Sequence, residues 1–316
     1  MAMVGYIVRR LVQSVLVVLV VTVIVFVLLH SLPGGPARAI LGPRATPGQI
    51  AQFDLENGLD KPLIVQYLTS VGAWFTGNFG FSYVLNQSVG SLLAERLPKT
   101  IILALFALLL TVIVAIPVGV YQAVRRNRPF DYVATGLSFV FYAAPTFFLG
   151  LILIEVFSSL LGWFPPEAPQ SDGIGPIFQQ FPAMILPIVT LALLSIAGFS
   201  RYMRSSVLDN ISQDYVRTAR AKGASSSRVL WRHVLRNALI PIITLLGLSL
   251  PALFAGALIT ESIFNFPGMG LLFWQAAQQS DYPVELGVVI VTAFATVIGN
   301  LMADVSLAAV DPRVTL

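Results

Sequence analysis

Ionisable side chains are scarce in this chain, and a few lie within or beside its apolar runs. Asp, Glu or His at mid-membrane depth could form a proton relay. Glu155 lies 23 residues after Tyr132, and ~35 Å of continuous helix would exceed the hydrocarbon thickness of ~30 Å. The same calculation from residue number and helical rise places four ionisable residues at the ends of their helices: His30, Glu155, Glu261 and Asp304. We expect interfacial or structural roles for them, and no titratable group in the hydrocarbon core.

Other reactive groups are missing from the sequence. It holds no cysteine, which excludes disulfides, thiolate catalysis and cysteine-based metal sites. It has no Gly-x4-Gly-Lys-Ser/Thr phosphate loop, so it does not bind ATP by that device. No His, Asp and Glu set has metal-ligand spacing, and no Ser-His-Asp set is evident. The sequence predicts that the chain itself is no enzyme, with no catalytic residue, metal or cofactor of its own.

The composition indicates an integral membrane protein. Of 316 residues, 56% are hydrophobic and 11% are charged, against roughly 25% charged in a soluble domain. Only helices satisfy their own backbone in lipid at these run lengths, so the predicted class is an all-α membrane protein. Six runs are long enough to cross a bilayer: residues 11–32, 100–124, 133–161, 183–200, 239–260 and 286–303.

The positive charges predict the orientation of these spans. With the N-terminus in the cytoplasm, fourteen of the 19 Lys and Arg residues lie on the inner side. The other five lie in one long outer loop, which has little weight in this rule. We therefore expect both termini in the cytoplasm. The chain divides into a first span (1–32), an extracytoplasmic loop (33–99) and a five-helix core (100–316) that includes a cytoplasmic loop at 201–238.

The outer loop carries signals of folded structure. Thr46 and Gln49 fit a capping box around Pro47, and Gly58 fits the position just after a helix. A second short helix is predicted over 62–75. Two interpretations stay open: a lid that shields the ends of the spans, or a docking surface for an extracellular partner.

Prolines interrupt several of the spans. Each removes a backbone hydrogen bond and tends to kink its helix. The kinks could serve packing alone, or they could surround a pathway and bend during transport. The residues are Pro117, Pro145, Pro187, Pro241 and Pro251.

The cytoplasmic stretch 214–238 is strongly basic, with six Lys or Arg residues and one acid. Nucleic-acid binding is a weak interpretation because the loop has no recognisable fold for it. Binding to anionic lipid and the excess of positive charge on the inner side of a membrane explain some of these basic residues. They do not explain the spacing of the helix-capping and glycine residues in this stretch. Asp214 can cap a helix over 215–222, Gly223 suits its end, and the serines at 225–227 offer a cap for a second helix that begins at Arg228. A short stiff helix between two spans would transmit a push to both.

This spacing resembles the "EAA" loop of ABC importer permeases, Glu-Ala-Ala-x3-Gly-x9-Ile-x-Leu-Pro. Ala219, Gly223 and Leu235 match, whereas the other four positions differ. The sequence YVRTARAKG at 215–223 is similar to the corresponding loop of the B-type permease subunit of dipeptide and oligopeptide ABC importers. Further segments that carry the resemblance are LPGGPA (32–37), GLDKPLIVQY (58–67), GNFGFS (77–82), ESIFNFPGMG (261–270) and NLMADVSLAAVDPR (300–313).

The resemblance implies a type I ABC importer permease in a bacterial or archaeal inner membrane. A second, homologous permease subunit would complete the pathway, two ABC ATPase subunits would bind ATP and Mg below, and a peptide-binding protein would dock above. The implied ATPase-coupling residues are Asp214, Tyr215, Arg217, Thr218, Ala219, Arg220, Ala221, Lys222 and Gly223. The residues implied at the outer mouth of the pathway are Glu261, Phe264, Phe266, Pro267 and Gly268.

Other functions stay open at this point. Relatives of this type also carry nickel, glutathione or other small solutes. A proton-coupled transporter or channel would need a titratable residue at mid-bilayer, and none is evident. A membrane scaffold would need neither a glycine-broken cytoplasmic loop nor a long outer loop.

Overall fold

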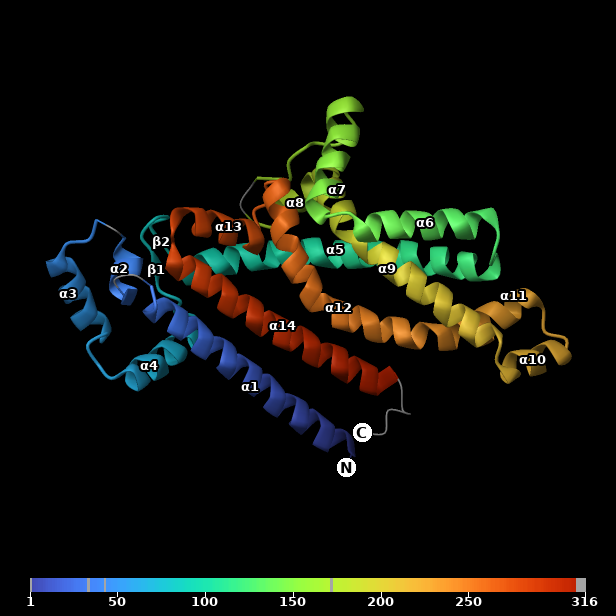
Figure 1. The fold of residues 1–316 in the computed structure, drawn as a ribbon, viewed down its shortest axis with the longest axis horizontal. Coiled ribbons are helices and arrows are strands. Elements are labelled where there is room, and N and C mark those ends of the chain that lie inside the picture. Colours follow the sequence, from blue (N-terminus) through green and yellow to red (C-terminus); the bar gives the residue numbers. More distant parts are fainter. Residues whose placement is uncertain (1, 33–34, 43, 171–172, 311–316) are drawn as a thin grey trace.

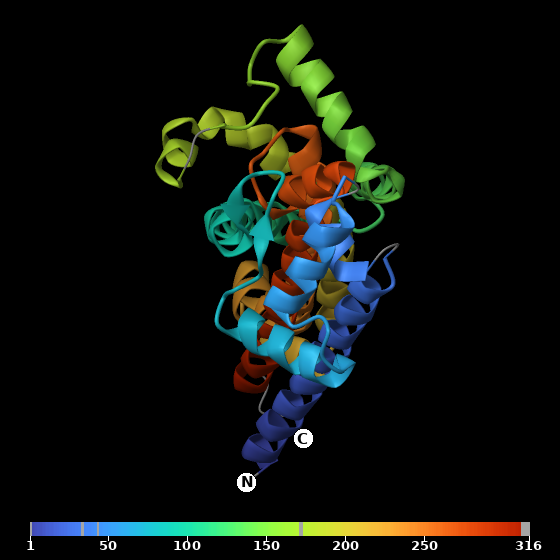
Figure 2. The same ribbon diagram turned by 90° about the vertical axis from the view of Figure 1, so that its left-hand side faces the viewer.

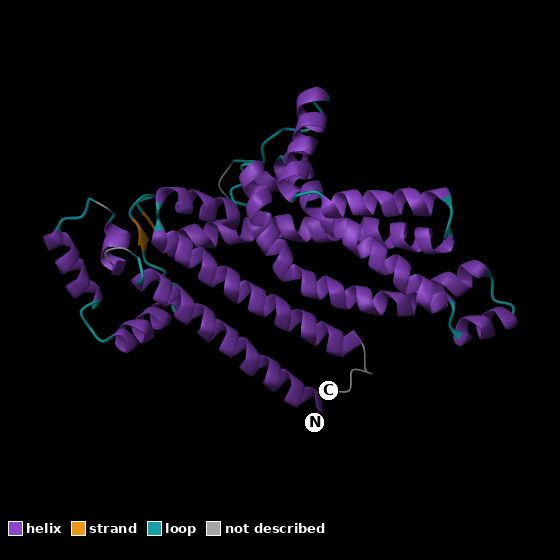
Figure 3. Cartoon of the chain, viewed as in Figure 1, coloured by secondary structure: helices purple, strands orange, loops and turns teal. Residues whose placement is uncertain are grey.

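A computed structural model shows an almost entirely helical chain and describes residues 2–32, 35–42, 44–170 and 173–310 (Figures 1 and 3). The outer loop contains α2 (Gly35–Leu41), α3 (Pro47–Asn57), α4 (Leu63–Phe75) and the paired strands β1 (Phe81–Ser82) and β2 (Gln87–Ser88). The long helices are α1 (Ala2–His30), α5 (Val89–Val124), α9 (Ile185–Ile211), α12 (Leu235–Ile263) and α14 (Tyr282–Val310). The remaining elements are α6 (Pro129–Ala143), α7 (Thr146–Leu153), the π-helical η1 (Ile154–Leu160), α8 (Gly175–Gln179), the 3-10 turn η2 (Phe181–Met184), α10 (Asp214–Ala221), α11 (Ser226–Arg228), the π-helical η3 (Val229–Val234) and α13 (Met269–Gln279).

The long helices confirm the predicted membrane fold. Three described stretches are apolar and long enough to cross a bilayer, namely α5, η2 with α9, and the first twenty residues of α14. Helices α1 and α12 have 29 residues each, which corresponds to ~43 Å. Helix α5 begins well before the predicted run because Ser88 caps it, accepting a hydrogen bond from the Ser91 N–H at 3.2 Å.

The third predicted span is not one straight helix. The chain bends by 110° between α6 and the helix formed by α7 and η1. Ala144 has an extended backbone at the break, as expected for a residue before a proline. Figure 2 shows the green α7–η1 segment projecting at the top of the view. The continuous helix assumed for Glu155 is therefore wrong; this residue is exposed on η1, and its place at the outer interface stays a prediction.

Helix α9 is the centre of the fold. Its apolar stretch is 56% buried, against 28% for those of α5 and α14. A Cβ on Gly119 of α5 would lie 2.6 Å from the Met203 Cβ and from the Ser200 carbonyl oxygen of α9. The two backbones therefore approach as closely as only a glycine permits.

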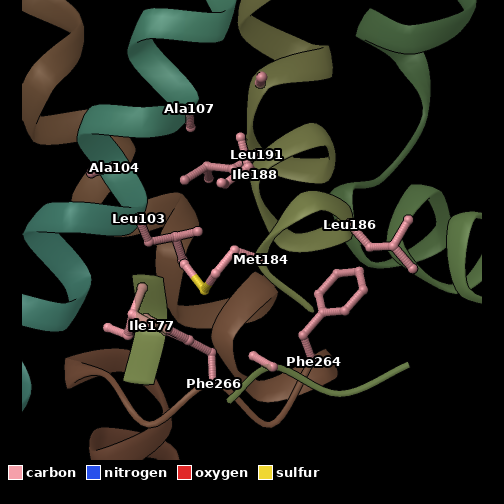
Figure 4. Close-up of a cluster of buried hydrophobic side chains, with 12 residues drawn as sticks. Leu103, Ala104, Ala107, Ile177, Met184, Leu186, Ile188, Leu191, Phe264 and Phe266 are labelled. Atoms are coloured by element: carbon pink, nitrogen blue, oxygen red, sulfur yellow. The ribbon is translucent and has the colours of Figure 1, made fainter. Parts of the chain in front are cut away.

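A core of buried side chains extends from this helix pair toward the outer end. Figure 4 shows residues of α5 and α9 converging with Ile177 of α8 and two phenylalanines that follow α12. Its members are Leu103, Ala104, Ala107, Ala168, Ile177, Met184, Leu186, Ile188, Leu191, Ala192, Phe264 and Phe266.

The ends of the helices separate into two sides (Figure 1). The start of α1, the end of α14 and the α10–α11 segment lie toward one side. The outer-loop elements and the start of α14 lie toward the other. This arrangement agrees with the orientation expected from the positive charges. Asp304 and Pro251 lie where the structure does not describe side chains, and Arg313 lies outside the described residues.

The α5–α9 crossing generates a stability prediction. Gly119→Val should lower the free energy of unfolding of the detergent-solubilised chain by about 1–3 kcal/mol, because the added side chain forces the two helices apart. The change is measured as a lower melting temperature. Gly136→Val on α6 is the matched control, because nothing lies within 4 Å of its Cβ position. Equal melting temperatures for the two variants would contradict the close crossing.

Candidate functional site

The predicted cytoplasmic helix exists as α10, with one correction at its start. The helix begins at Asp214, and Gln213 occupies the N-cap position without a side-chain hydrogen bond. The prediction that Asp214 caps the helix was wrong. Its carboxylate instead lies in the first turn and pairs with the Arg217 guanidinium at 3.4 Å, where it still faces the positive end of the helix dipole.

The end of α10 is formed as its residues predict. Gly223 has a φ of +82°, and the Ala224 N–H donates back to the Ala219 carbonyl at 3.1 Å. The Ser225 hydroxyl then accepts from the Arg228 N–H at 3.4 Å and begins α11. The chain continues through η3 into α12 without a further break.

Helix α10 has one apolar and one polar face. Val216 is fully buried and packs in a cytoplasmic cluster with residues of α9, η3 and α12, and Ala219 lies at its edge. The Tyr215 hydroxyl donates to Asn210 on the last turn of α9 at 2.7 Å. The exposed residues are Asp214, Tyr215, Arg217, Thr218, Arg220, Ala221, Lys222 and Gly223. The helix is thus fixed to two spans, and its polar face is free to meet another molecule.

The outer turn is organised by a buried carboxylate. Glu261 is 0% exposed and accepts hydrogen bonds from the Thr100 hydroxyl (2.6 Å), the Gly270 N–H (2.6 Å) and the Leu271 N–H (3.2 Å). The Thr100 oxygen accepts in turn from the Met269 N–H at 2.8 Å. Two side chains therefore satisfy the first N–H groups of α13, and the carboxyl group of Glu261 faces the N-terminus of this helix. The same contacts join α5 to α12.

The other residues expected at the outer mouth are buried as well. Phe264 and Phe266 are 0% exposed within the core of Figure 4, and Pro267 and Gly268 are buried beside them. A Cβ on Gly268 would overlap the Glu261 carboxylate. These side chains hold the turn and do not line an opening in this structure. The location of the turn near the outer mouth stays a prediction.

The outer loop folds onto the ends of the spans. The Thr46–Gln49 capping box and the left-handed Gly58 are present as predicted, and α4 begins after Pro62. His30 hydrogen-bonds Gln66 at 2.9 Å, which gives this histidine the structural role expected of it. The buried Ser82 hydroxyl donates to Asp281 and ties the hairpin to the start of α14.

One charged feature was missed by the sequence reasoning. Arg204 of α9 pairs with the buried Asp131 of α6 through two bonds of 2.7 and 2.8 Å. Arg201 instead lies over the rings of Phe139 (4.7 Å) and Tyr142 (5.7 Å) of α6. The only sequence signal was the three-residue spacing of the two arginines on one helix face. Within the described ranges, no group of three or more His, Asp or Glu side chains is placed to hold a metal ion.

Two family models match the chain. Residues 3–104 match the N-terminal part of a binding-protein-dependent transport system membrane component. Residues 115–316 match the binding-protein-dependent transport system inner membrane component. The chain belongs to this family. It is accordingly a multi-pass permease subunit of the inner membrane, as the sequence predicted.

Full-length relatives support the same assignment. The permease is 42% identical over 314 residues to the oligopeptide transport system permease protein AppB of Bacillus subtilis, with 99% of each chain covered. It is 37% identical over 312 residues to the glutathione transport system permease protein GsiC of Salmonella choleraesuis, again with 99% of each chain covered.

Solved structures confirm the fold. An inward-facing methionine ABC transporter, MetNI, gives a TM-score of 0.58 at 17% identity, covering 70% of the permease and 96% of that chain. An amino acid ABC transporter gives a TM-score of 0.51 at 17% identity, covering 71% and 94%. The predicted type I importer architecture is therefore correct.

The Glu261 contacts generate a second prediction. Glu261→Ala should destabilise the permease by about 2–4 kcal/mol, because it leaves buried N–H groups at the start of α13 without acceptors. Glu261→Gln should cost less, since its amide oxygen still accepts one bond. Thermal unfolding of the purified protein measures both, with the exposed Glu155→Ala as control. Full stability of Glu261→Ala would refute the capping role.

Proposed function

We propose that this permease subunit forms half of the pathway of an ATP-driven importer of short peptides. The observation that carries the cargo assignment is the 42% identity to an oligopeptide permease along the full chain. The proposal includes a second, homologous permease subunit and an extracytoplasmic peptide-binding protein. The folded outer loop offers a surface on which such a protein could dock.

The energy would come from two ABC ATPase subunits on the cytoplasmic side, which would bind ATP and Mg. We assign their contact to the segment 214–223. Three observations support this assignment: α10 is packed through the buried Val216, its polar face is exposed, and it lies in the segment that connects α9 through α11 and η3 to α12. A displacement of α10 would therefore move both helices, because its apolar face is part of their shared cluster.

Glutathione is a second candidate cargo, favoured by the 37% identity to a glutathione permease. Glutathione is itself a small peptide with free carboxylates, so the two candidates demand similar chemistry of a pathway. In binding-protein-dependent systems the separate binding protein makes the first selection of solute. Cargo must therefore be tested with the cognate binding protein.

Uptake by the reconstituted complex tests the cargo. Tagged permease should co-purify with an ATPase, and proteoliposomes with internal ATP and external binding protein should accumulate di-, tri- or longer peptides. Glutathione and nickel are the comparison solutes. Uptake of nickel without peptide, or transport by the permease alone without an ATPase, would reject the proposal.

Gly223→Val tests the coupling. Valine is strained at a φ of +82°, so the end of α10 should reorient while the spans still assemble. We expect peptide uptake and peptide-stimulated ATPase activity to fall at least about tenfold, which corresponds to ~1.4 kcal/mol. Gly162→Val, with a φ of +64° and equally open surroundings, places the same strain on the outer side and should leave coupling intact. Wild-type coupling in Gly223→Val would contradict the assignment.

A further inference from the structure

A cavity of about 460 Å³ with several polar lining residues opens between α6 and α9, within the range of about 300–1,000 Å³ typical of small-molecule sites. Four of its lining side chains carry hydroxyl groups and two carry guanidinium groups. The lining residues are Thr135, Tyr142, Gly198, Arg201, Tyr202, Arg204 and Ser205. Those polar groups of the lining that make no hydrogen bond within the protein need water or a polar ligand as a partner.

Only one of the two arginines has its charge neutralised. Asp131 accepts two bonds from Arg204 and a third from the Asn127 N–H at 3.0 Å. Arg201 makes cation–π contacts with Phe139 and Tyr142. In the part of the chain that the structure describes, no carboxylate lies within ion-pair distance of Arg201. The cavity therefore carries one uncompensated positive charge.

The position of Arg201 argues against a lipid phosphate as its partner. Phe139 and Tyr142 follow Asp131 by 8 and 11 residues on α6, or about 12 and 16 Å further from the basic turn at 125–128. Arg204 reaches back toward that turn, whereas Arg201 reaches away from it, although their Cα atoms are only ~4.5 Å apart along α9. An arginine that snorkels to headgroups would point toward the surface. Arg201 is exposed and points away from that turn, and in a membrane-spanning bundle a charge directed away from the headgroups is instead typical of a solute pathway.

We infer that Arg201, with the surrounding hydroxyl groups, binds the terminal carboxylate of the transported peptide. The inference rests on the proposed function, since it concerns the cargo of the permease. A guanidinium can donate two parallel bonds to a carboxylate, and aromatic faces keep it aligned. The terminal carboxylate is common to all peptides whatever their side chains. One fixed cation can therefore serve cargo of varied sequence.

The test compares trialanine with trialanine amide, which differ only in the terminal charge. In the full importer complex in liposomes, at saturating binding protein, Arg201→Gln should reduce uptake of trialanine about tenfold and uptake of the amide less than about twofold. Arg201→Lys should retain part of the trialanine uptake, because lysine keeps the positive charge but cannot donate two parallel hydrogen bonds to a carboxylate. Arg125→Gln is the matched control: Arg125 also lies over an aromatic ring, that of Tyr121 at 5.7 Å, but does not line the cavity.

Three results would overturn the inference. Equal losses for both peptides would assign Arg201 a structural role, and unchanged uptake would assign it none. An effect present only in liposomes containing phosphatidylglycerol would identify an anionic lipid as the ligand.

Labelling separates this inference from the proposed function. If the wild-type complex imports no peptide, the proposed function fails. Phenylglyoxal modification of Arg201, followed by mass spectrometry, then still reports on the site. Slower labelling with trialanine than with its amide supports carboxylate binding, and equal rates reject it.

Discussion

The close approach of α5 and α9 at Gly119 is the constraint on which the rest of the structure depends. With no Cβ between them, the two backbones form a rigid pair. The outer core, the cytoplasmic cluster and the paired Asp131 of α6 all attach to this pair. Helix α10 follows α9 after a two-residue turn, so the position of its first residue is fixed by the end of α9.

The helices are held together differently at the two ends of the permease. At the outer end, Glu261 and Thr100 replace the missing hydrogen-bond acceptors of the first turn of α13. Separation of these helices would expose a carboxylate and several N–H groups to lipid, which is costly. At the cytoplasmic end the packing around Val216 is apolar, and the polar residues face outward. The outer end is thus internally satisfied, whereas the cytoplasmic end leaves its polar surface open to a partner.

Local signals predicted much of this structure. Capping at Thr46 and Ser225 and the helix ends at Gly58 and Gly223 depend on a few neighbouring residues, so they could be predicted from the sequence. The path after Pro145 could not, because a proline permits a break without specifying its angle. The burial of Glu261 depends on Thr100, 161 residues earlier in the chain. Likewise, the different surroundings of Arg201 and Arg204 depend on how α6 lies beside α9.

Gly223 combines a left-handed backbone with open surroundings, since nothing lies within 4 Å of its Cβ position. Its constraint is therefore one of handedness and not of volume. A D-residue would adopt this dihedral angle without strain, whereas a β-branched L-residue such as valine would be strained there. Because the residue itself adds no side chain, another molecular surface can approach the main chain directly at the end of α10.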